Sequence, residues 1–211
     1  MIERDDPRLR LCAVTDDLRD GVSGLVSRAV AAERGGVTMV LLRLKHADAR
    51  VLVEAGRALR EALQIPVIVC ERLDVALACG ASGVHLTSSS MPVIAVRSQA
   101  PAGFLVGASV SVDDDLPSSL DADYVTIGPV AGAGAGSLGV PQFMRLAQAC
   151  GRPVMAIGGV DAALVPTLRA AGASGVAVIR AVLGADDPEA AASELMRGGV
   201  ARNDETPDHM Q

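Results

Sequence analysis

Aromatic side chains are almost absent from this chain of 211 residues, which has two phenylalanines, one tyrosine and no tryptophan. Because half of the residues are nevertheless hydrophobic, a core has to be built from aliphatic side chains. Nucleic-acid-binding proteins commonly offer basic surfaces and aromatic stacking platforms. The net charge of −6, the lack of any basic run and the shortage of aromatics therefore argue against a nucleic acid as partner.

Long hydrophobic runs are missing as well. No stretch approaches the roughly 20 apolar residues that a membrane span needs, and the charged start MIERDDPRLR does not fit a signal peptide. The four cysteines form no CxxC pair and fit buried thiols in a reducing compartment. We therefore expect a cytoplasmic protein that does not interact with membranes.

Short apolar segments alternate with amphipathic, helix-like segments along most of the chain. Regular alternation of this kind predicts an α/β fold with a parallel sheet. No GxGxxG follows the first expected strand, which favours a closed (β/α)8 TIM barrel over an open, doubly wound sheet. We expect one barrel domain over residues 1–197 and a polar, disordered tail over 198–211. The expected strands are residues 11–15, 37–43, 66–70, 83–86, 104–109, 124–127, 154–157 and 174–179.

The ends of the seventh and eighth expected strands form the clearest candidate site. Gly158 and Gly159 stop the seventh strand and leave two backbone amides without side-chain cover, and Val178 and Ile179 end the eighth. In many barrels the loops after these two strands bind a phosphate. The alternative is that the glycines only permit a tight turn. Arg180 either adds a charged contact to a phosphate or begins a solvated helix.

A second group of candidates follows the second expected strand. Arg43 and Lys45 alternate, so on a strand they share a face and predict a second anion site. The alternative is a surface ion pair with Glu71 or Asp74. His46 is a candidate for moving a proton because its ordinary pKa lies near neutrality, although a lone histidine after a strand is more often a loop residue.

The end of the third expected strand carries a thiol and a carboxylate. Glu71 is interpreted as a metal ligand, as an acid–base group or as the ion-pair partner of Arg43. Cys70 is interpreted as a small hydrophobic residue rather than a nucleophile, since a reactive thiol needs a lowered pKa. His85, within the fourth expected strand, is interpreted as a core histidine whose hydrogen bonds are satisfied.

Several segments, in this order, resemble the thiamine phosphate synthase and thiazole tautomerase superfamily over about residues 11–195. The segments are LCAVTD, GVTMVLLRLK, PVIVCERLDVALACGASGVHL, VGASV, DYVTIGPV, VMAIGGV and GVAVIRAV. The resemblance implies a (β/α)8 barrel that acts in thiamine biosynthesis. In the synthase branch, an aminopyrimidine pyrophosphate loses pyrophosphate with the help of Mg²⁺, and the nitrogen of a thiazole phosphate attacks the resulting carbocation.

The residues that hold magnesium and pyrophosphate in the synthase branch are mostly replaced here. In the VQLREK pattern the glutamine and the glutamate become Leu41 and Leu44. The two magnesium-binding aspartates correspond to Glu71 and Ser90, and a serine hydroxyl offers Mg²⁺ no charge. The TxTK segment that binds pyrophosphate corresponds to residues 133–136, AGAG. Mg²⁺ therefore has Glu71 as its one candidate carboxylate ligand.

The tautomerase branch relies on a histidine two residues after a serine of the fifth strand. Here the segment reads Ser109-Val110-Ser111, so Ser109 remains as a candidate catalytic or ligand-binding residue and the histidine is missing. Gly128, in the DYVTIGPV segment, joins the candidate phosphate-binding residues. The chain thus matches neither catalytic pattern in full.

The leading hypothesis is a divergent member of this superfamily, nearer its tautomerase side, that binds a phosphorylated thiazole or thiamine-type heterocycle in thiamine biosynthesis or salvage. The glycine pair would bind the phosphate, Arg43 and Lys45 a second anionic group, and His46 or Glu71 would move a proton. Two alternatives stay open: an active synthase with rebuilt pyrophosphate contacts, and a non-catalytic ligand-binding or partner protein. Assembly into a homo-oligomer is open too.

Overall fold

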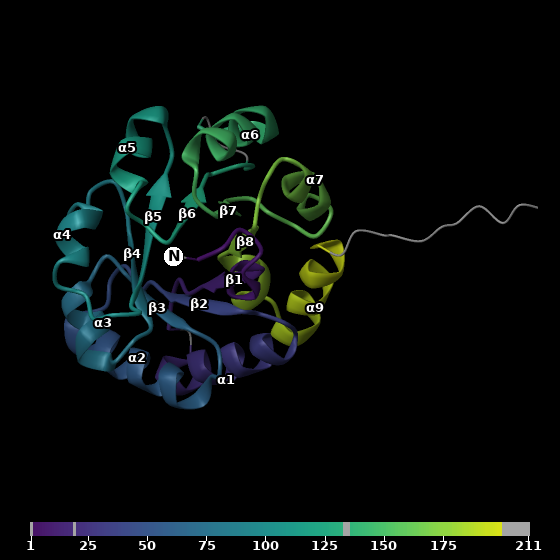
Figure 1. Cartoon of the computed structure of the whole chain (residues 1–211). Coiled ribbons are helices and arrows are strands. Elements are labelled where there is room, and N and C mark those ends of the chain that lie inside the picture. Colours follow the sequence, from purple (N-terminus) through teal and green to yellow (C-terminus); the bar gives the residue numbers. More distant parts are fainter. Residues whose placement is uncertain (1, 19, 133–135, 200–211) are drawn as a thin grey trace, which may run out of the picture.

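All strands of the protein run parallel and close into one barrel, in chain order from β1 to β8 (Figure 1). The computed structural model describes residues 2–18, 20–132 and 136–199. Closure comes from the pairing of the first and last strands, in which Leu11 lies opposite Val176. The predicted (β/α)8 fold is confirmed. The strands are β1 (Leu11–Val14), β2 (Met39–Leu42), β3 (Val67–Cys70), β4 (Gly83–Leu86), β5 (Leu105–Val110), β6 (Tyr124–Ile127), β7 (Val154–Ile157) and β8 (Gly175–Val178).

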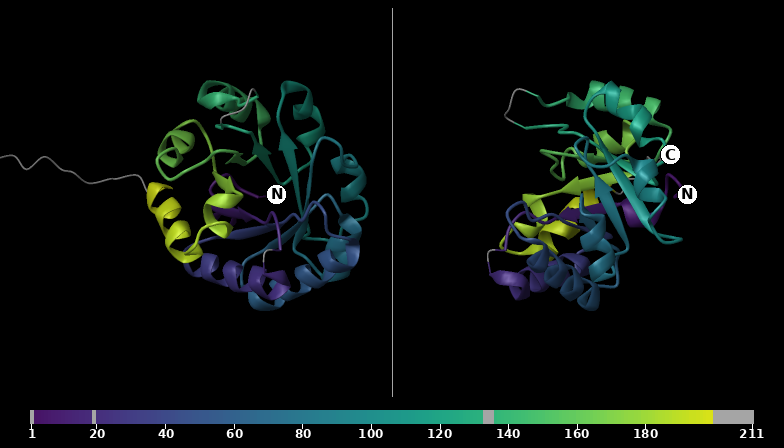
Figure 2. Two further views of the ribbon diagram at one scale, coloured as in Figure 1. Left: turned by 180° about the vertical axis from the view of Figure 1, so that it is seen from behind. Right: turned by 90° about the vertical axis from the view of Figure 1, so that its left-hand side faces the viewer.

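Helices surround the barrel and cover its outer face, as the opposite view in Figure 2 also shows. The α-helices are α1 (Gly21–Arg34), α2 (Ala49–Ala62), α3 (Leu73–Cys79), α4 (Val93–Arg97), α5 (Leu116–Ser119), α6 (Gly139–Cys150), α7 (Val165–Ala170), α8 (Arg180–Leu183) and α9 (Pro188–Gly199). Two 3-10 turns, η1 (Pro7–Leu9) and η2 (Asp113–Asp115), precede β1 and α5. Within the described residues, no helix is long and apolar enough to cross a membrane.

The strands read as unbroken apolar runs because both of their faces are buried. In β1, Leu11 and Ala13 point outward to the core between sheet and helices. Cys12 and Val14 point inward to a separate core inside the barrel. Successive side chains of a strand alternate between its two faces, so each strand serves both cores. The four cysteines are free thiols, as expected for a chain without a disulfide framework.

The first residues of the chain close the amino-terminal end of the barrel, and the N label in Figure 1 lies over the barrel centre. Ile2 and Leu9 belong to the inner core and are 6% and 0% exposed. Asp6 caps η1 by accepting hydrogen bonds from Arg8, and this contact holds the pKa of the Asp6 carboxyl below its usual range. A Cβ atom on Gly175 would lie 1.8 Å from the Leu9 carbonyl oxygen, so β8 needs glycine where this segment crosses it.

Several element boundaries differ from the sequence-based expectation. Strand β2 ends at Leu42, three residues before Lys45, because the chain leaves the sheet at Arg43. Asp161 does not cap a helix directly: its Oδ1 accepts the Leu164 N–H at 2.9 Å in a turn, and α7 starts only at Val165. The short helix α8 starts at Arg180, as one of the two alternatives for this residue predicted. In the expected tail, residues 198 and 199 belong to α9, and 200–211 lie outside the described residues.

Candidate functional site

The loop after β7 passes so close to the loop after β6 that only glycine fits at two positions. Gly158 and Gly159 have φ angles of 91° and 70°, which side-chain-bearing residues rarely adopt. A Cβ on Gly158 would lie 2.6 Å from the Cα of Pro129, and one on Gly159 would lie 2.2 Å from the carbonyl oxygen of Ala131. The Ala131 N–H also donates to the Gly158 oxygen at 2.9 Å. The glycines therefore do more than permit a turn: they let two loops pack backbone against backbone.

A cavity of about 220 Å³ lies between the loops after β7 and β8. It brings together five predicted phosphate-binding residues: Gly158, Gly159, Val178, Ile179 and Arg180. We call this cavity the cradle. In the described part of the chain, the amides of Gly158, Gly159, Ile179 and Arg180 donate to no other residue. Unpaired backbone amides around a small cavity are the arrangement that binds a phosphate or sulfate group.

A second cavity of about 220 Å³ opens at the carboxyl ends of the strands, and we call it the mouth. Ile179 lines both the cradle and the mouth, so the two cavities are neighbours. Part of the mouth wall is aliphatic and includes Leu41 and Ile157. Leu44, by contrast, packs in the outer core, so one of the two leucines that replace polar family residues faces the mouth and the other does not.

The polar floor of the mouth consists of three side chains from β4, β5 and β6. His85 Nε2 lies 3.0 Å from Ser109 Oγ and 3.2 Å from Thr126 Oγ1, and the two hydroxyl oxygens are 3.3 Å apart. The His85 ring stacks on Tyr124 with 5.6 Å between the ring centroids. Complete burial lowers the pKa of His85 to about 4, so the imidazole is neutral near pH 7.

Cys70 also lines the mouth, and its thiol is unreactive by environment. Desolvation, followed by the nearby Glu71 carboxylate, raises the pKa of Cys70 to about 11, and Arg43 offsets only part of this rise. Thiolate is the nucleophilic form of cysteine. The side chain therefore behaves as a small hydrophobic residue, as the sequence suggested.

The predicted second anion site is only partly assembled. Arg43 lines the mouth, is held by a pair of hydrogen bonds between its backbone and Thr15 Oγ1, and has Nη1 3.5 Å from Asp16 Oδ1. Lys45 and His46 are exposed in the turn after β2 and line neither cavity. The expectation that Arg43 and Lys45 share a strand face is wrong, because the strand has already ended.

Glu71 lies at the rim of the mouth in a strained backbone conformation. Its φ of 63° makes it the one described non-glycine residue with positive φ. Thr87 Oγ1 donates to Glu71 Oε1 at 2.5 Å and lies 3.1 Å from Ser89 Oγ and 3.2 Å from Ser90 Oγ. The predicted Arg43 ion pair is replaced by this hydroxyl contact, since the Arg43 guanidinium faces Asp16 instead.

These residues do not fit a magnesium site. Mg²⁺ prefers anionic oxygens in a near-octahedral arrangement, whereas the rim offers one carboxylate and three hydroxyl groups. Across the described residues there is no group of three or more His, Cys, Asp or Glu side chains placed to hold a metal ion. Of residues 133–136, which correspond to the family's pyrophosphate-binding segment, 133–135 lie outside the described residues.

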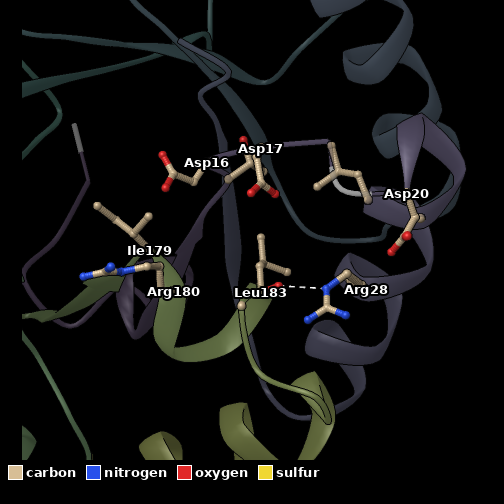
Figure 3. A pocket seen from close by; sticks show the side chains of 11 residues that line it. Asp16, Asp17, Asp20, Arg28, Ile179, Arg180 and Leu183 are labelled. Atoms are coloured by element: carbon tan, nitrogen blue, oxygen red, sulfur yellow. Dashed lines mark hydrogen bonds between the residues drawn. The ribbon is translucent and has the colours of Figure 1, made fainter. Parts of the chain in front are cut away.

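A small charged pocket lies between the loop after β1 and α8 (Figure 3), and it shares Ile179 and Arg180 with the cradle. Asp16, Asp17 and Asp20 line one side of it, and Arg28 and Arg180 line the other. The Arg28 Nε donates to the carbonyl oxygen of Leu183 at 2.7 Å and so ties α1 to the end of α8. This hydrogen bond holds α8, the helix that begins at the cradle, against α1.

The structure brings some of the predicted site residues together and leaves others apart. Ser109 and Gly128 lie in the mouth, but the Gly128 N–H already donates to the Val110 oxygen at 3.4 Å and is not available to a phosphate. Sequence reasoning missed Thr126, Thr15 and Thr87. The one feature of the sequence that could have pointed to them is that each is a hydroxyl residue near the end of a predicted apolar strand.

The closed parallel barrel, with cradle and mouth at the carboxyl ends of its strands, defines a (β/α)8 protein that carries its site on the usual catalytic face. Comparison with known proteins places the chain in one family within this class of barrels. Residues 11–182 match the family described as thiamine monophosphate synthase, and the chain belongs to that family.

Individual relatives agree with this assignment. The chain is 40% identical to a thiamine-phosphate synthase of Methanoculleus marisnigri over 195 residues, covering 88% of this chain and 92% of the relative. It is 34% identical to that of Vibrio campbellii over 199 residues, covering 89% and 96%. The solved structure of thiamine phosphate pyrophosphorylase from Pyrococcus furiosus superposes with a TM-score of 0.80 at 31% identity, covering 92% of this chain and 96% of that one.

Proposed function

We propose that the protein binds a phosphorylated thiazole or thiamine-type heterocycle in thiamine biosynthesis or salvage, with the phosphate in the cradle and the ring in the mouth. The observation that carries the proposal is the set of four unpaired backbone amides around the cradle. The exposed Arg180 guanidinium adds a positive charge at its edge. Family membership and the relatives' names support a ligand of the thiamine pathway.

The ring would extend from the cradle past Ile179 into the mouth, where aliphatic side chains cover its faces. Arg43 is the proposed contact for a second anionic group, because it is the described cation that lines the mouth. Glu71 is the proposed proton-transfer group in preference to His46, since its hydrogen-bond partner Thr87 lines the mouth. No step is assigned to a metal ion.

Calorimetry with a hydroxyethylthiazole phosphate and the corresponding unphosphorylated alcohol tests this proposal. The wild-type protein should prefer the phosphate by about 100-fold, the contribution of one or two hydrogen bonds to a charged group. Gly159→Ala should lose most of that preference, because the new methyl group clashes with Ala131 and displaces the loop after β7, which carries the amides of the cradle. Gly151→Ala is the matched control: this glycine also has positive φ, but its Cβ would meet nothing within 4 Å.

Equal binding of the phosphate and the alcohol by the wild-type protein would refute the proposal. Loss of the preference in both glycine variants would assign the effect to backbone strain rather than to the cradle. The proposed role of Glu71 in proton transfer has its own test. Glu71→Gln should abolish turnover of the bound ligand by proton transfer, while its affinity measured by calorimetry stays within about threefold of the wild-type value. An unchanged turnover rate would remove that role.

A second candidate is the full synthase reaction, in which a pyrimidine pyrophosphate is joined to the thiazole phosphate. The names of the relatives at 34% and 40% identity favour it. Release of pyrophosphate on mixing the two substrates in a buffer containing Mg²⁺ would support this candidate. Binding of thiazole phosphate without release of pyrophosphate would favour the binding function alone.

A further inference from the structure

A third cavity, of about 220 Å³, lies outside the barrel wall, where α7 and α9 cover strands β1 and β8 (Figure 1). It shares no lining residue with the cradle or the mouth. Leu11 and Val176, which lie opposite each other in the sheet, line its inner side, and the helices contribute Val165 and Leu195. These four residues are at most 5% exposed, so the cavity reaches into the outer core of the protein.

Helix α9 is held away from this cavity by close backbone contacts at both of its ends. Gly35 leaves no room for a Cβ beside the carbonyl oxygen of Glu189, and a Cβ on Gly198 would lie 2.5 Å from the carbonyl oxygen of Ala162. A gap in a protein interior costs stability roughly in proportion to its volume, unless the structure can collapse around it. An apolar cavity of about 150 Å³ can bind benzene. This cavity therefore has room for a small organic ligand.

Two arginines line the amino-terminal end of this cavity. Arg10 immediately precedes β1, and Arg169 lies in the last turn of α7, on the same side of the helix as Val165. Arg169 Nη1 donates to the carbonyl oxygen of Ser174, whereas the Arg10 side chain has no hydrogen bond or ion pair within the described residues. None of the described lining residues is acidic. The cavity therefore combines aliphatic walls with a positive charge that nothing in its lining compensates.

We propose that this cavity is a binding site for a small amphipathic anion, a monocarboxylate with a short aliphatic chain. The chain lies against Leu11, Val176 and Leu195, and the carboxylate faces Arg10 and the remaining nitrogen atoms of Arg169. Guanidinium groups suit this contact because their planar array of donors matches the two oxygens of a carboxylate. The site is separate from the proposed thiazole phosphate site and uses none of its residues.

Methyl NMR of the full chain during a titration with hexanoate tests this proposal. The methyl signals of Val165, Val176 and Leu195 should shift together, with a dissociation constant of about 1 mM or lower, because the free energy of burying a CH₂ group is gained several times over. Acetate has the charge without the chain and should leave these signals unmoved. Hexanol has the chain without the charge and should bind at least about fivefold more weakly than hexanoate.

Two variants separate the contribution of the charge from that of the apolar walls. Arg10→Gln should weaken hexanoate binding about fivefold and leave the affinity for hexanol unchanged. Arg50→Gln removes the same charge from the exposed side of α2 and is the matched control, with wild-type affinity for both probes. Val165→Phe should abolish the shifts caused by hexanoate, because its ring fills the cavity, and urea denaturation should show a stability no lower than that of the wild type.

Three results would overturn the proposal. In the first, the three methyl signals stay unmoved at about 10 mM hexanoate, tenfold above the expected dissociation constant. In the second, hexanoate and hexanol bind equally well, or Arg10→Gln and Arg50→Gln behave alike, so that the cavity does not recognise the charge. In the third, hexanoate shifts Leu41 and Ile157 instead, which would place it in the mouth. None of these results bears on thiazole phosphate binding in the cradle, so the two proposals can fail separately.

Discussion

At the residue scale, the neutral imidazole of His85 couples the stability of the barrel to pH. Its pKa falls to about 4 in the folded protein, whereas an exposed histidine titrates near 6.5. Between these two values the unfolded chain binds a proton that the folded protein does not. Stability from this group is therefore fully present above pH 6.5 and is lost as the pH falls toward 4.

We predict that the free energy of unfolding falls by roughly 3 kcal/mol between pH 6.5 and pH 4 because of His85 alone. Urea denaturation at several pH values measures the total change. Carboxylates contribute as well, so the difference between wild type and His85→Gln isolates the histidine. Parallel curves for the two proteins across this range would contradict the prediction.

Cys70 offers a second prediction at this scale. A thiol with a pKa of about 11 carries roughly 100-fold less thiolate at pH 8 than one with the usual pKa of 9. Iodoacetamide should therefore modify the native protein at least that much more slowly than free cysteine, and Cys70→Ala should leave the rate of modification unchanged. Rapid, selective alkylation of Cys70 would show that the thiol is activated after all.

At the scale of elements, Arg97 joins α4 to two loops that enter the barrel strands. Its Nη2 lies 2.5 Å from Asp123 Oδ2, and its Nη1 donates to the Phe104 oxygen at 3.0 Å. Asp123 Oδ2 also accepts the Val106 N–H at 2.9 Å, at the second residue of β5. With 12% of its side chain exposed, this carboxylate is the least accessible of the ion-paired acids among the described residues, followed by that of Asp6 at 14%, and both fix loops at the amino-terminal end of the barrel.

Removing the charge of Asp123 should therefore be costly. Asp123→Asn is expected to lower the free energy of unfolding by about 2–4 kcal/mol, because it leaves a partly buried guanidinium without its partner. Asp74→Asn is the matched control, since Asp74 pairs with Arg72 on the surface. That change should cost less than about 1 kcal/mol. Equal losses in urea denaturation would refute the distinction between the two pairs.

The elements and the cradle could be predicted from the sequence, whereas the floor of the mouth could not. In the sequence, Gly158 and Gly159 mark the end of β7. Gly80 marks the end of α3, where it adopts the left-handed conformation that glycine allows. Strands buried on both faces carry no alternation of polar and apolar residues. The sequence therefore does not tell that Thr126 points inward toward His85, or that β2 ends before Lys45.

At the scale of the whole molecule, the first and last helices complete the outer ring. Helix α1 packs against α9, and Gly35 at the end of α1 sits where a Cβ would lie 2.2 Å from the Glu189 carbonyl oxygen. The φ of Gly35 is −75°, so the need for glycine here is steric and not conformational. Residues more than 150 positions apart thus meet at one close backbone contact.

Gly35→Ala should lower the free energy of unfolding by about 1–3 kcal/mol, because the added methyl group forces the two helices apart. Arg34→Ala, which removes the exposed ion pair to Glu189 in the same interface, should cost less than about 1 kcal/mol. Both variants are compared by urea denaturation. A neutral or stabilising Gly35→Ala change would show that α9 moves away without cost.

The segment that seals the barrel at its amino-terminal end has a practical consequence for handling the protein. Ile2 packs inside the barrel, so a peptide fused ahead of it has to leave directly from the inner core. An affinity tag placed ahead of Ile2 would compete with Ile2 and Leu9 for the position that closes the amino-terminal end of the barrel. A tag joined beyond α9 makes no such demand, and is the better choice for every measurement of stability and binding described above.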